Sequence, residues 1–307
     1  MRQLLYISLS LILFSTYNSL ANERTLYVDK FNSILGNQNK EDKLLFFCQD
    51  NNFTTLVLYE LHLIRKRLPI NDKNKIKELA NFIKLAKTKY NVKSVIASGE
   101  NSEIFLNYIH IYNQTRTSDI ERFNGYNIEY EYWNKTKSDL GGYYCENYLR
   151  KNKIPCTEKG SFNYFEETIS ILSLLKNEVS YNIDLDVYIT NFTKNQIERL
   201  KKYDIKYRLS AYAGNVKLSS KQIQKELKIL SSCKCLKDVS IILSSELFFM
   251  SGHLKYNSLD KTERKFKQYI SKYKNLNITE FTYFKYTDLK KSVSFEKQRR
   301  TGIKQNY

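Results

Sequence analysis

Carboxylates and an amide alternate with aromatic residues in one short segment of this sequence, a pattern that could carry out acid–base chemistry. Over Tyr126–Tyr132 and the residue that follows, strand alternation places four side chains on one face: Asn127, Glu129, Glu131 and Trp133. Two carboxylates this close cannot both ionise cheaply in a poorly hydrated site, so we expect the pKa of one to rise. That group would be a proton donor. The alternative is that both acids are solvated or paired with lysines.

Other acidic and aromatic residues lie at or near the ends of predicted strands. They are Asp29, Glu60, Asp186, Tyr188, Tyr212, Glu246 and Tyr286. Aromatic rings stack on the apolar faces of sugars, while amides and carboxylates bind sugar hydroxyl groups. With Trp133 and Asn127, this set predicts a carbohydrate ligand. The 3 histidines of the chain are scattered, and we predict neither a metal site nor a cofactor.

The hydrophobic pattern predicts a fold that can bring these strand ends together. Apolar and β-branched runs predict strands at Thr25–Asp29, Thr55–Glu60, Lys93–Ser98, Tyr126–Tyr132, Ile183–Thr190, Lys206–Tyr212, Val239–Ser245 and Thr279–Tyr286. Helical spacing predicts helices at Asn39–Asn51, Asp72–Tyr90, Glu103–Tyr112, Ser161–Glu178, Lys194–Tyr203, Ser219–Ser232 and Ser258–Lys274. This alternation predicts a single-domain α/β fold, a (β/α)8 TIM-type barrel. An open doubly wound sheet is the alternative, but no glycine-rich loop follows Asp29.

The longest predicted connection runs from Trp133 to Gly160, after the fourth strand. A βα connection of a barrel lies on the face where the carboxyl ends of the strands converge, which is where barrels build their sites. This connection contains Cys145 and Cys156, which bracket a short polar stretch and are the best candidates for a disulfide. Cys48 falls on the apolar face of a predicted helix, so we expect it to be unpaired in the core.

Residues 1–21 have the composition of a signal peptide. Arg2 supplies the positive start, an apolar stretch follows, and Ser19-Leu20-Ala21 forms a small-x-small cleavage site. No second apolar run of about 18 residues occurs, so no membrane span is expected after cleavage. We therefore predict a secreted protein, periplasmic or extracellular, with a barrel at 22–289 and a basic C-terminal tail at 290–307.

The charge of the chain is strongly basic, with 50 Lys+Arg against 32 Asp+Glu and a formal net charge of +18. Lysine outnumbers arginine 38 to 12, and the basic residues spread over the whole sequence. Phosphate recognition favours clustered arginine, which binds phosphate in a bidentate manner. The composition therefore does not predict a dedicated nucleic-acid partner. With 42% hydrophobic residues the chain can bury a sizeable core, which excludes wholesale disorder.

The sequence resembles family 18 glycoside hydrolases (chitinases and endo-β-N-acetylglucosaminidases) in the run Phe123-Asn124-Gly125-Tyr126-Asn127-Ile128-Glu129-Tyr130-Glu131. The family signature there is Asp-Gly-x-Asp-x-Asp-x-Glu. Gly125 and Glu131 match it, while Asn124, Asn127 and Glu129 stand at its three Asp positions. The resemblance implies that Glu131 is the general acid and that Glu129 orients an acetamido group. It also implies that Tyr212 contacts that group.

The leading hypothesis from the sequence is a secreted, glycoside-hydrolase-like barrel that acts on a glycan. The resemblance implies an N-acetylhexosamine-containing substrate, with Glu131 as general acid/base and Glu129 as its partner. A non-catalytic carbohydrate-binding barrel is the first alternative. A metal-dependent phosphoesterase, which would use the ring of acids to hold Mg²⁺ or Ca²⁺, is the second.

Overall fold

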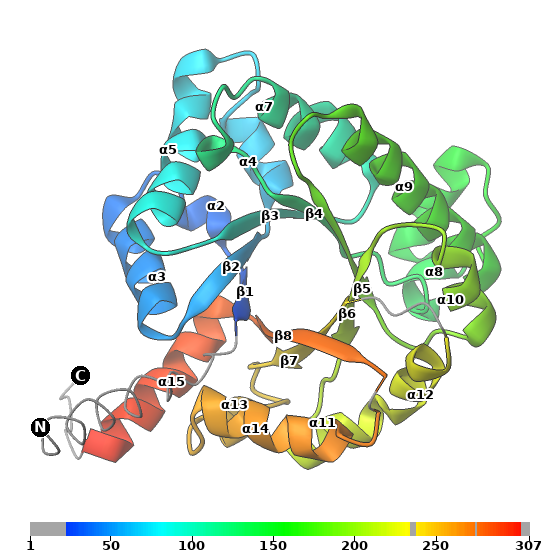
Figure 1. Ribbon diagram of the computed structural model, residues 1–307. Coiled ribbons are helices and arrows are strands. Elements are labelled where there is room, and N and C mark those ends of the chain that lie inside the picture. The colour runs from blue at the N-terminus through cyan, green and yellow to red at the C-terminus, as the bar shows by residue number, and fades with distance from the viewer. Residues whose placement is uncertain (1–22, 234–237, 274, 302–307) are drawn as a thin grey trace, which may run out of the picture.

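The computed structural model describes residues 23–233, 238–273 and 275–301, in which eight parallel strands form one closed barrel (Figure 1). The strands are β1 (Arg24–Val28), β2 (Phe53–Leu58), β3 (Ser94–Gly99), β4 (Gly125–Ile128), β5 (Asp184–Ile189), β6 (Lys206–Ser210), β7 (Asp238–Ser244) and β8 (Asn277–Phe284). Each strand pairs with the next one along the chain, and β8 pairs with β1. The predicted (β/α)8 fold is confirmed. The predicted signal peptide lies outside the described residues, so export stays a prediction.

Helices surround the barrel in a ring (Figure 1). They are α2 (Phe31–Ile34), α3 (Gln38–Asp50), α4 (Leu61–Arg67), α5 (Lys73–Lys89), α6 (Ser102–Ile104), η1 (Phe105–His110), α7 (Ile111–Gln114), η2 (Asp119–Glu121), α8 (Lys135–Ser138), η3 (Cys145–Leu149), η4 (Arg150–Asn152), α9 (Glu158–Glu178), α10 (Lys194–Leu200), α11 (Val216–Gln222), α12 (Gln224–Ser232), α13 (Ser251–Leu254), α14 (Leu259–Ile270) and α15 (Tyr286–Thr301). Among the described residues, no helix is long and apolar enough to cross a membrane.

The main core lies between the strands and this ring of helices. Helix α5 shows how the sequence builds it: the Asp72 side chain accepts hydrogen bonds from the first-turn amides of Asn74 and Lys75, which caps the helix. Ile76 and Ile83, seven residues apart, then lie on one buried face. Since every side chain of β2 is buried, this strand is covered on both faces.

The inside of the barrel holds a buried ion-pair network at the level of the middle of the strands. Arg208 is fully buried, and its Nε and Nη2 atoms donate to Asp186 Oδ2 at 2.8 and 2.5 Å, while Nη1 donates to Glu280 Oε1 at 2.7 Å. Burial by itself raises the pKa of Glu280, but the charges of Arg208 and Lys206 outweigh it, and the pKa lies below its usual range. A small apolar cluster around Tyr27 also lies inside the barrel.

The boundaries of β4 and of the C-terminal segment differ from the prediction. Strand β4 ends at Ile128 rather than at Tyr132, because β3 ends at Gly99 and supplies no further partner beyond one bond from the Glu129 amide. The segment from 290, predicted to be a tail, belongs to helix α15 as far as Thr301, and its Val293 is buried. Residues 302–307 of that predicted tail lie outside the described part of the chain.

Candidate functional site

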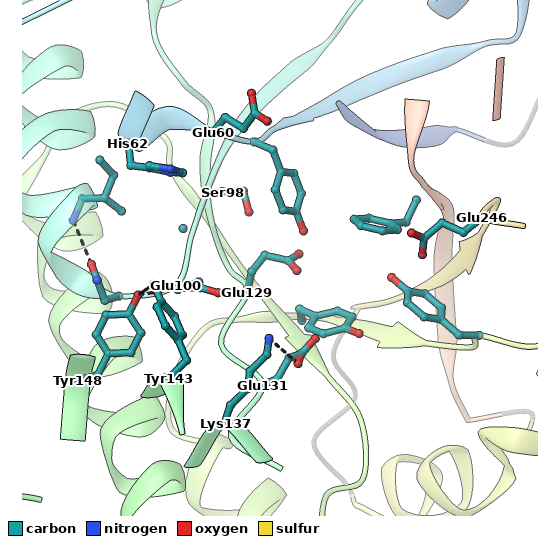
Figure 2. Close-up of a pocket in the computed structure, with 17 residues that line it drawn as sticks. Glu60, His62, Ser98, Glu100, Glu129, Glu131, Lys137, Tyr143, Tyr148 and Glu246 are labelled. Carbon is teal, nitrogen blue, oxygen red and sulfur yellow. Dashed lines mark hydrogen bonds and ion pairs between the residues drawn. The ribbon is translucent and has the colours of Figure 1, made fainter. Parts of the chain in front are cut away.

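A pocket of about 660 Å³ opens where the carboxyl ends of the strands meet (Figure 2). Its lining comes from loops after β2, β3, β4, β6 and β7 and from the ends of β3, β5 and β8. The residues are Tyr59, Glu60, His62, Ser98, Gly99, Glu100, Asn101, Ile104, Glu129, Glu131, Lys137, Tyr143, Tyr148, Tyr188, Tyr212, Glu246 and Phe284. This volume is in the range of small-molecule sites, and the place is where barrel enzymes act.

Glu129 projects into the middle of the pocket (Figure 2). The Asn127 amide lies beneath it and donates to Glu129 Oε1 at 2.8 Å and to Ser98 Oγ at 3.2 Å. Burial raises the pKa of Glu129 above its usual range, although hydrogen bonds from Tyr27, Tyr59 and Asn127 partly oppose that rise. A carboxyl with a raised pKa and fixed orientation can act as a general acid or base. The predicted rise therefore occurs, mainly through burial and only to a lesser extent through Glu131.

Aromatic rings form a continuous arc around Glu129. Ring centroids are 5.9 Å apart between Tyr59 and Phe284, 6.1 Å between Phe284 and Tyr212, and 6.4 Å between Tyr212 and Tyr188. Burial raises the pKa of Tyr59, Tyr188 and Tyr212, and the charge of Glu129 raises it further. These three rings therefore lie near Glu129. The arc gives the pocket aromatic walls around one carboxylate.

Glu131 has a different environment from Glu129. Its Oε2 atom forms an ion pair with Lys137 Nζ at 2.8 Å and accepts a hydrogen bond from Asn134 Nδ2 at 2.9 Å (Figure 2). Its backbone amide donates to the Tyr144 hydroxyl at 3.2 Å. Glu131 is therefore held by an ammonium group and an amide.

The connection after β4 forms one wall of the pocket. Its Tyr148 hydroxyl donates to Glu100 Oε2 at 2.9 Å, and its Tyr143 ring also lines the cavity. A disulfide between Cys145 and Cys156 ties this wall to the start of α9. The wall is therefore covalently anchored on the side away from the cavity.

The electrostatic character of the pocket is opposite to that of the whole chain. Five glutamates line it, namely Glu60, Glu100, Glu129, Glu131 and Glu246, against Lys137 as the one lysine among the lining residues. Lys285 lies beside the pocket and pairs with Glu246 at 3.3 Å, but it also pairs with Asp288 at 3.6 Å. The mouth therefore keeps an excess of negative charge, although the net charge of the sequence is +18.

Six of the predicted site residues meet in this pocket: Glu60, Glu129, Glu131, Tyr188, Tyr212 and Glu246. Five others do not line it. Asn127 is fully buried below Glu129, and Asp186 is one layer deeper, bound to Arg208. Trp133 packs behind Tyr188 with the ring centroids 5.4 Å apart.

The other two predicted site residues, Asp29 and Tyr286, do not line the pocket because β1 and β8 end before them. Asp29 accepts hydrogen bonds from the amide and hydroxyl of Thr287 at 3.0 and 2.6 Å. Tyr286 begins helix α15 instead of ending β8, so its ring is buried in the helix layer against Phe47. Strand alternation does not extend past Phe284, which takes the inward position instead.

Lys137, Tyr143 and Tyr148 are among the lining residues that the sequence does not single out. They belong to an irregular connection, where no strand or helix period predicts which way a side chain points. The cysteine pair was the available signal, because it marked this connection as ordered and placed it on the mouth of the barrel. Among the described residues, no group of three or more His, Cys, Asp or Glu side chains could hold a metal ion.

Comparisons with known proteins give matches to solved structures only. No family model matches the chain, and a search of the curated proteins finds no match. The chain is similar to a 2,3-dimethylmalate lyase of the PEP mutase/isocitrate lyase superfamily (10% identity, TM-score 0.43, covering 92% of this chain and 84% of that one). It is also similar to a dihydropteroate synthase from Coxiella burnetii (10% identity, TM-score 0.44, covering 91% of this chain and 93% of that one). A β-glucuronidase from Faecalibacterium prausnitzii matches at 7% identity with a TM-score of 0.47, and the match covers 87% of this chain and 42% of that one.

The comparisons do not bear out the prediction of a glycoside hydrolase or its carbohydrate-binding and phosphoesterase alternatives. The structures that match over most of their own length are lyases, mutase-type enzymes and dihydropteroate synthases. The β-glucuronidase is matched over 42% of its chain. Identities this low bear on the fold alone, and the resemblance of the motif to family 18 is not tested by them.

Proposed function

We propose that the pocket binds a small organic cation, an ammonium compound, and that Glu129 is the carboxylate that faces it. The charge of the lining carries this proposal: five glutamates and one lysine surround a cavity in a chain of net charge +18. A cleft lined by one sign of charge focuses the field and concentrates ligands of the opposite sign. The lining residues themselves, rather than the overall composition, therefore select the charge of the ligand.

The aromatic arc supports the same ligand class. A cation over the face of a tyrosine or phenylalanine ring gains about 0.5–1 kcal/mol when exposed and about 2 kcal/mol when desolvated. Tyr59, Phe284, Tyr212 and Tyr188 follow one another around Glu129, so one ammonium group can contact several rings and one carboxylate. A neutral ligand would gain from the rings but not from the charge.

Glu129 also gives the proposed site a reactive group. Its raised pKa brings the carboxyl closer to the range in which it can accept and return a proton near neutral pH. A bound ammonium compound with an ionisable N–H or an acidic C–H beside the nitrogen would present such a proton. We therefore assign Glu129 the role of acid–base residue in any reaction that the pocket performs.

Isothermal titration with choline and with 3,3-dimethyl-1-butanol, its neutral isostere, tests the proposal. Wild type should bind choline about tenfold or more tightly than the alcohol, because a hydrogen-bonded or charged partner contributes about 1.5–3 kcal/mol. Glu129→Gln should remove most of this difference, and Lys137→Met should strengthen choline binding because it removes the competing ammonium. Glu178→Gln, an exposed position at the end of α9, is the charge-matched control. Equal binding of the two probes to wild type would refute the proposal.

A further inference from the structure

The most exposed large apolar side chains of the described residues lie in two segments that also line the pocket. Phe248, Leu140 and Leu247 are 88%, 75% and 74% exposed. Leu140 precedes the lining residue Tyr143, and Leu247 and Phe248 directly follow the lining residue Glu246. Both segments follow the carboxyl end of a strand, so all three apolar side chains belong to the face on which the pocket opens.

The turn after β7 holds Leu247 and Phe248 in this position. The Phe249 amide donates to the Glu246 carbonyl at 2.9 Å, and the Met250 amide donates to the Ser244 carbonyl at 2.9 Å. On one side of the exposed pair Glu246 faces the cavity, and on the other the Phe249 ring lies 5.3 Å from the ring of Tyr212. The two residues between these anchors are directed outward by a hydrogen-bonded turn.

We propose that the ligand is an amphiphilic ammonium compound, whose cationic head lies in the pocket and whose hydrocarbon chain lies on Leu247 and Phe248. This inference rests on the proposed function of the pocket. Single exposed apolar residues are ordinary, but an adjacent leucine and phenylalanine at the rim of a cavity form a patch that gains from burial. The patch carries no charge, so it suits the part of a ligand that has none.

Because the Leu247–Phe248 patch adjoins the pocket, one molecule can occupy both surfaces. Consecutive Cα atoms are about 3.8 Å apart, so the step from Glu246 to Leu247 spans only a few methylene groups. A chain attached to an ammonium group inside the acidic mouth can leave the cavity beside Glu246, the residue that precedes the patch. An anionic amphiphile would have the same chain but would be repelled by the five glutamates of the lining.

Titration of butyltrimethylammonium and octyltrimethylammonium, both kept below the concentrations at which they form micelles, tests this inference. A fully buried methylene contributes about fourfold in affinity and a half-buried one about twofold, so wild type should bind the octyl compound about tenfold or more tightly. The double variant Leu247→Ser/Phe248→Ser should reduce this ratio to about threefold or less. Leu174→Ser removes another exposed leucine, near the far end of α9, and should keep the wild-type ratio.

The possible outcomes separate the two proposals. Binding of both ammonium ions with no dependence on chain length, or an unchanged ratio in the double variant, overturns the amphiphile and leaves the cation pocket standing. Octyl sulfate bound as tightly as octyltrimethylammonium would show that the chain alone drives binding, which also overturns the inference. Failure of wild type to bind either ammonium ion overturns the proposed function and the inference together.

Discussion

Removal of the Cys145–Cys156 disulfide should cost the protein stability and should loosen one wall of the pocket. The two cysteines are 11 residues apart, and closure of a loop of that length removes unfolded-state entropy worth about 3 kcal/mol at 25 °C. A chain of this size has an unfolding entropy of about 0.6 kcal/mol per degree. The double variant Cys145→Ala/Cys156→Ala should therefore melt about 5 °C below wild type.

The same variant should bind choline more weakly, because the wall carries Tyr143 and Tyr148. Tyr148 holds Glu100 through a 2.9 Å hydrogen bond, and a loosened wall would have to be ordered again when the ligand binds. Ordering one such side chain costs about 0.5–1.5 kcal/mol, which corresponds to about two- to tenfold in affinity.

Differential scanning calorimetry and isothermal titration measure the two effects separately. A reductant should lower the melting temperature of wild type to that of the double variant and should leave the variant unchanged, which controls for the substitutions themselves. A melting temperature equal to wild type would refute the entropy argument. A lower melting temperature with unchanged choline affinity would show that the wall does not shape the binding site.

Two further predictions concern the charges inside the barrel. Because burial raises the pKa of Glu129, choline affinity should fall as the pH is lowered through a range above the ordinary glutamate value of about 4.3, and Glu129→Gln should lack this step; a wild-type titration curve identical to that of the variant would contradict this. Arg208→Met should lower the free energy of unfolding by about 3–5 kcal/mol, because Asp186 and Glu280 lose the cation that they share. Urea denaturation measures this change, and a loss below about 1 kcal/mol would argue against a stabilising role for the network.

The barrel could be predicted from the sequence because its signals are local. Eight short apolar runs alternate with helical periods, and a closed parallel sheet is the fold that buries both faces of each run. The inward positions of Glu129 and Glu131 could also be predicted, even though β4 ends before either residue. Their direction follows from the strand that leads into them, which sets the path of the chain for a few residues beyond its last hydrogen bond.

The ends of the strands and the irregular connection could not be predicted in the same way. Whether a strand continues depends on whether its neighbour still offers a partner, and that is a property of two segments far apart in the sequence. Tyr286 illustrates this, since two more residues of strand would have aimed it into the pocket, whereas the start of α15 buries it outside. Asp186 points inward as expected but lies too deep, because alternation gives the face and not the layer.

Glu131 and Glu129 have different surroundings for a physical reason that a short motif does not contain. Glu131 is paired with Lys137, which lies six residues away in an irregular connection. The neighbouring Glu129 has the environment that the motif implied for Glu131, with tyrosine and amide donors and burial in place of a cation. Acid–base roles therefore follow from the groups around each carboxyl, and these groups come from β1, β4, the loop after β2 and the connection after β4.

The charge of the chain and the charge of the pocket lead to opposite expectations about the ligand, and distance decides between them. Surface charges separated by more than about 8–10 Å are largely screened at physiological ionic strength, whereas charges that share a partly enclosed cavity are screened much less. The 50 basic residues are spread over the sequence, while five glutamates line one cavity of about 660 Å³. A bound molecule therefore experiences chiefly the acidic lining. The basic surface repels an approaching cation over longer distances. Added salt screens this repulsion and should therefore increase the association rate of the cation.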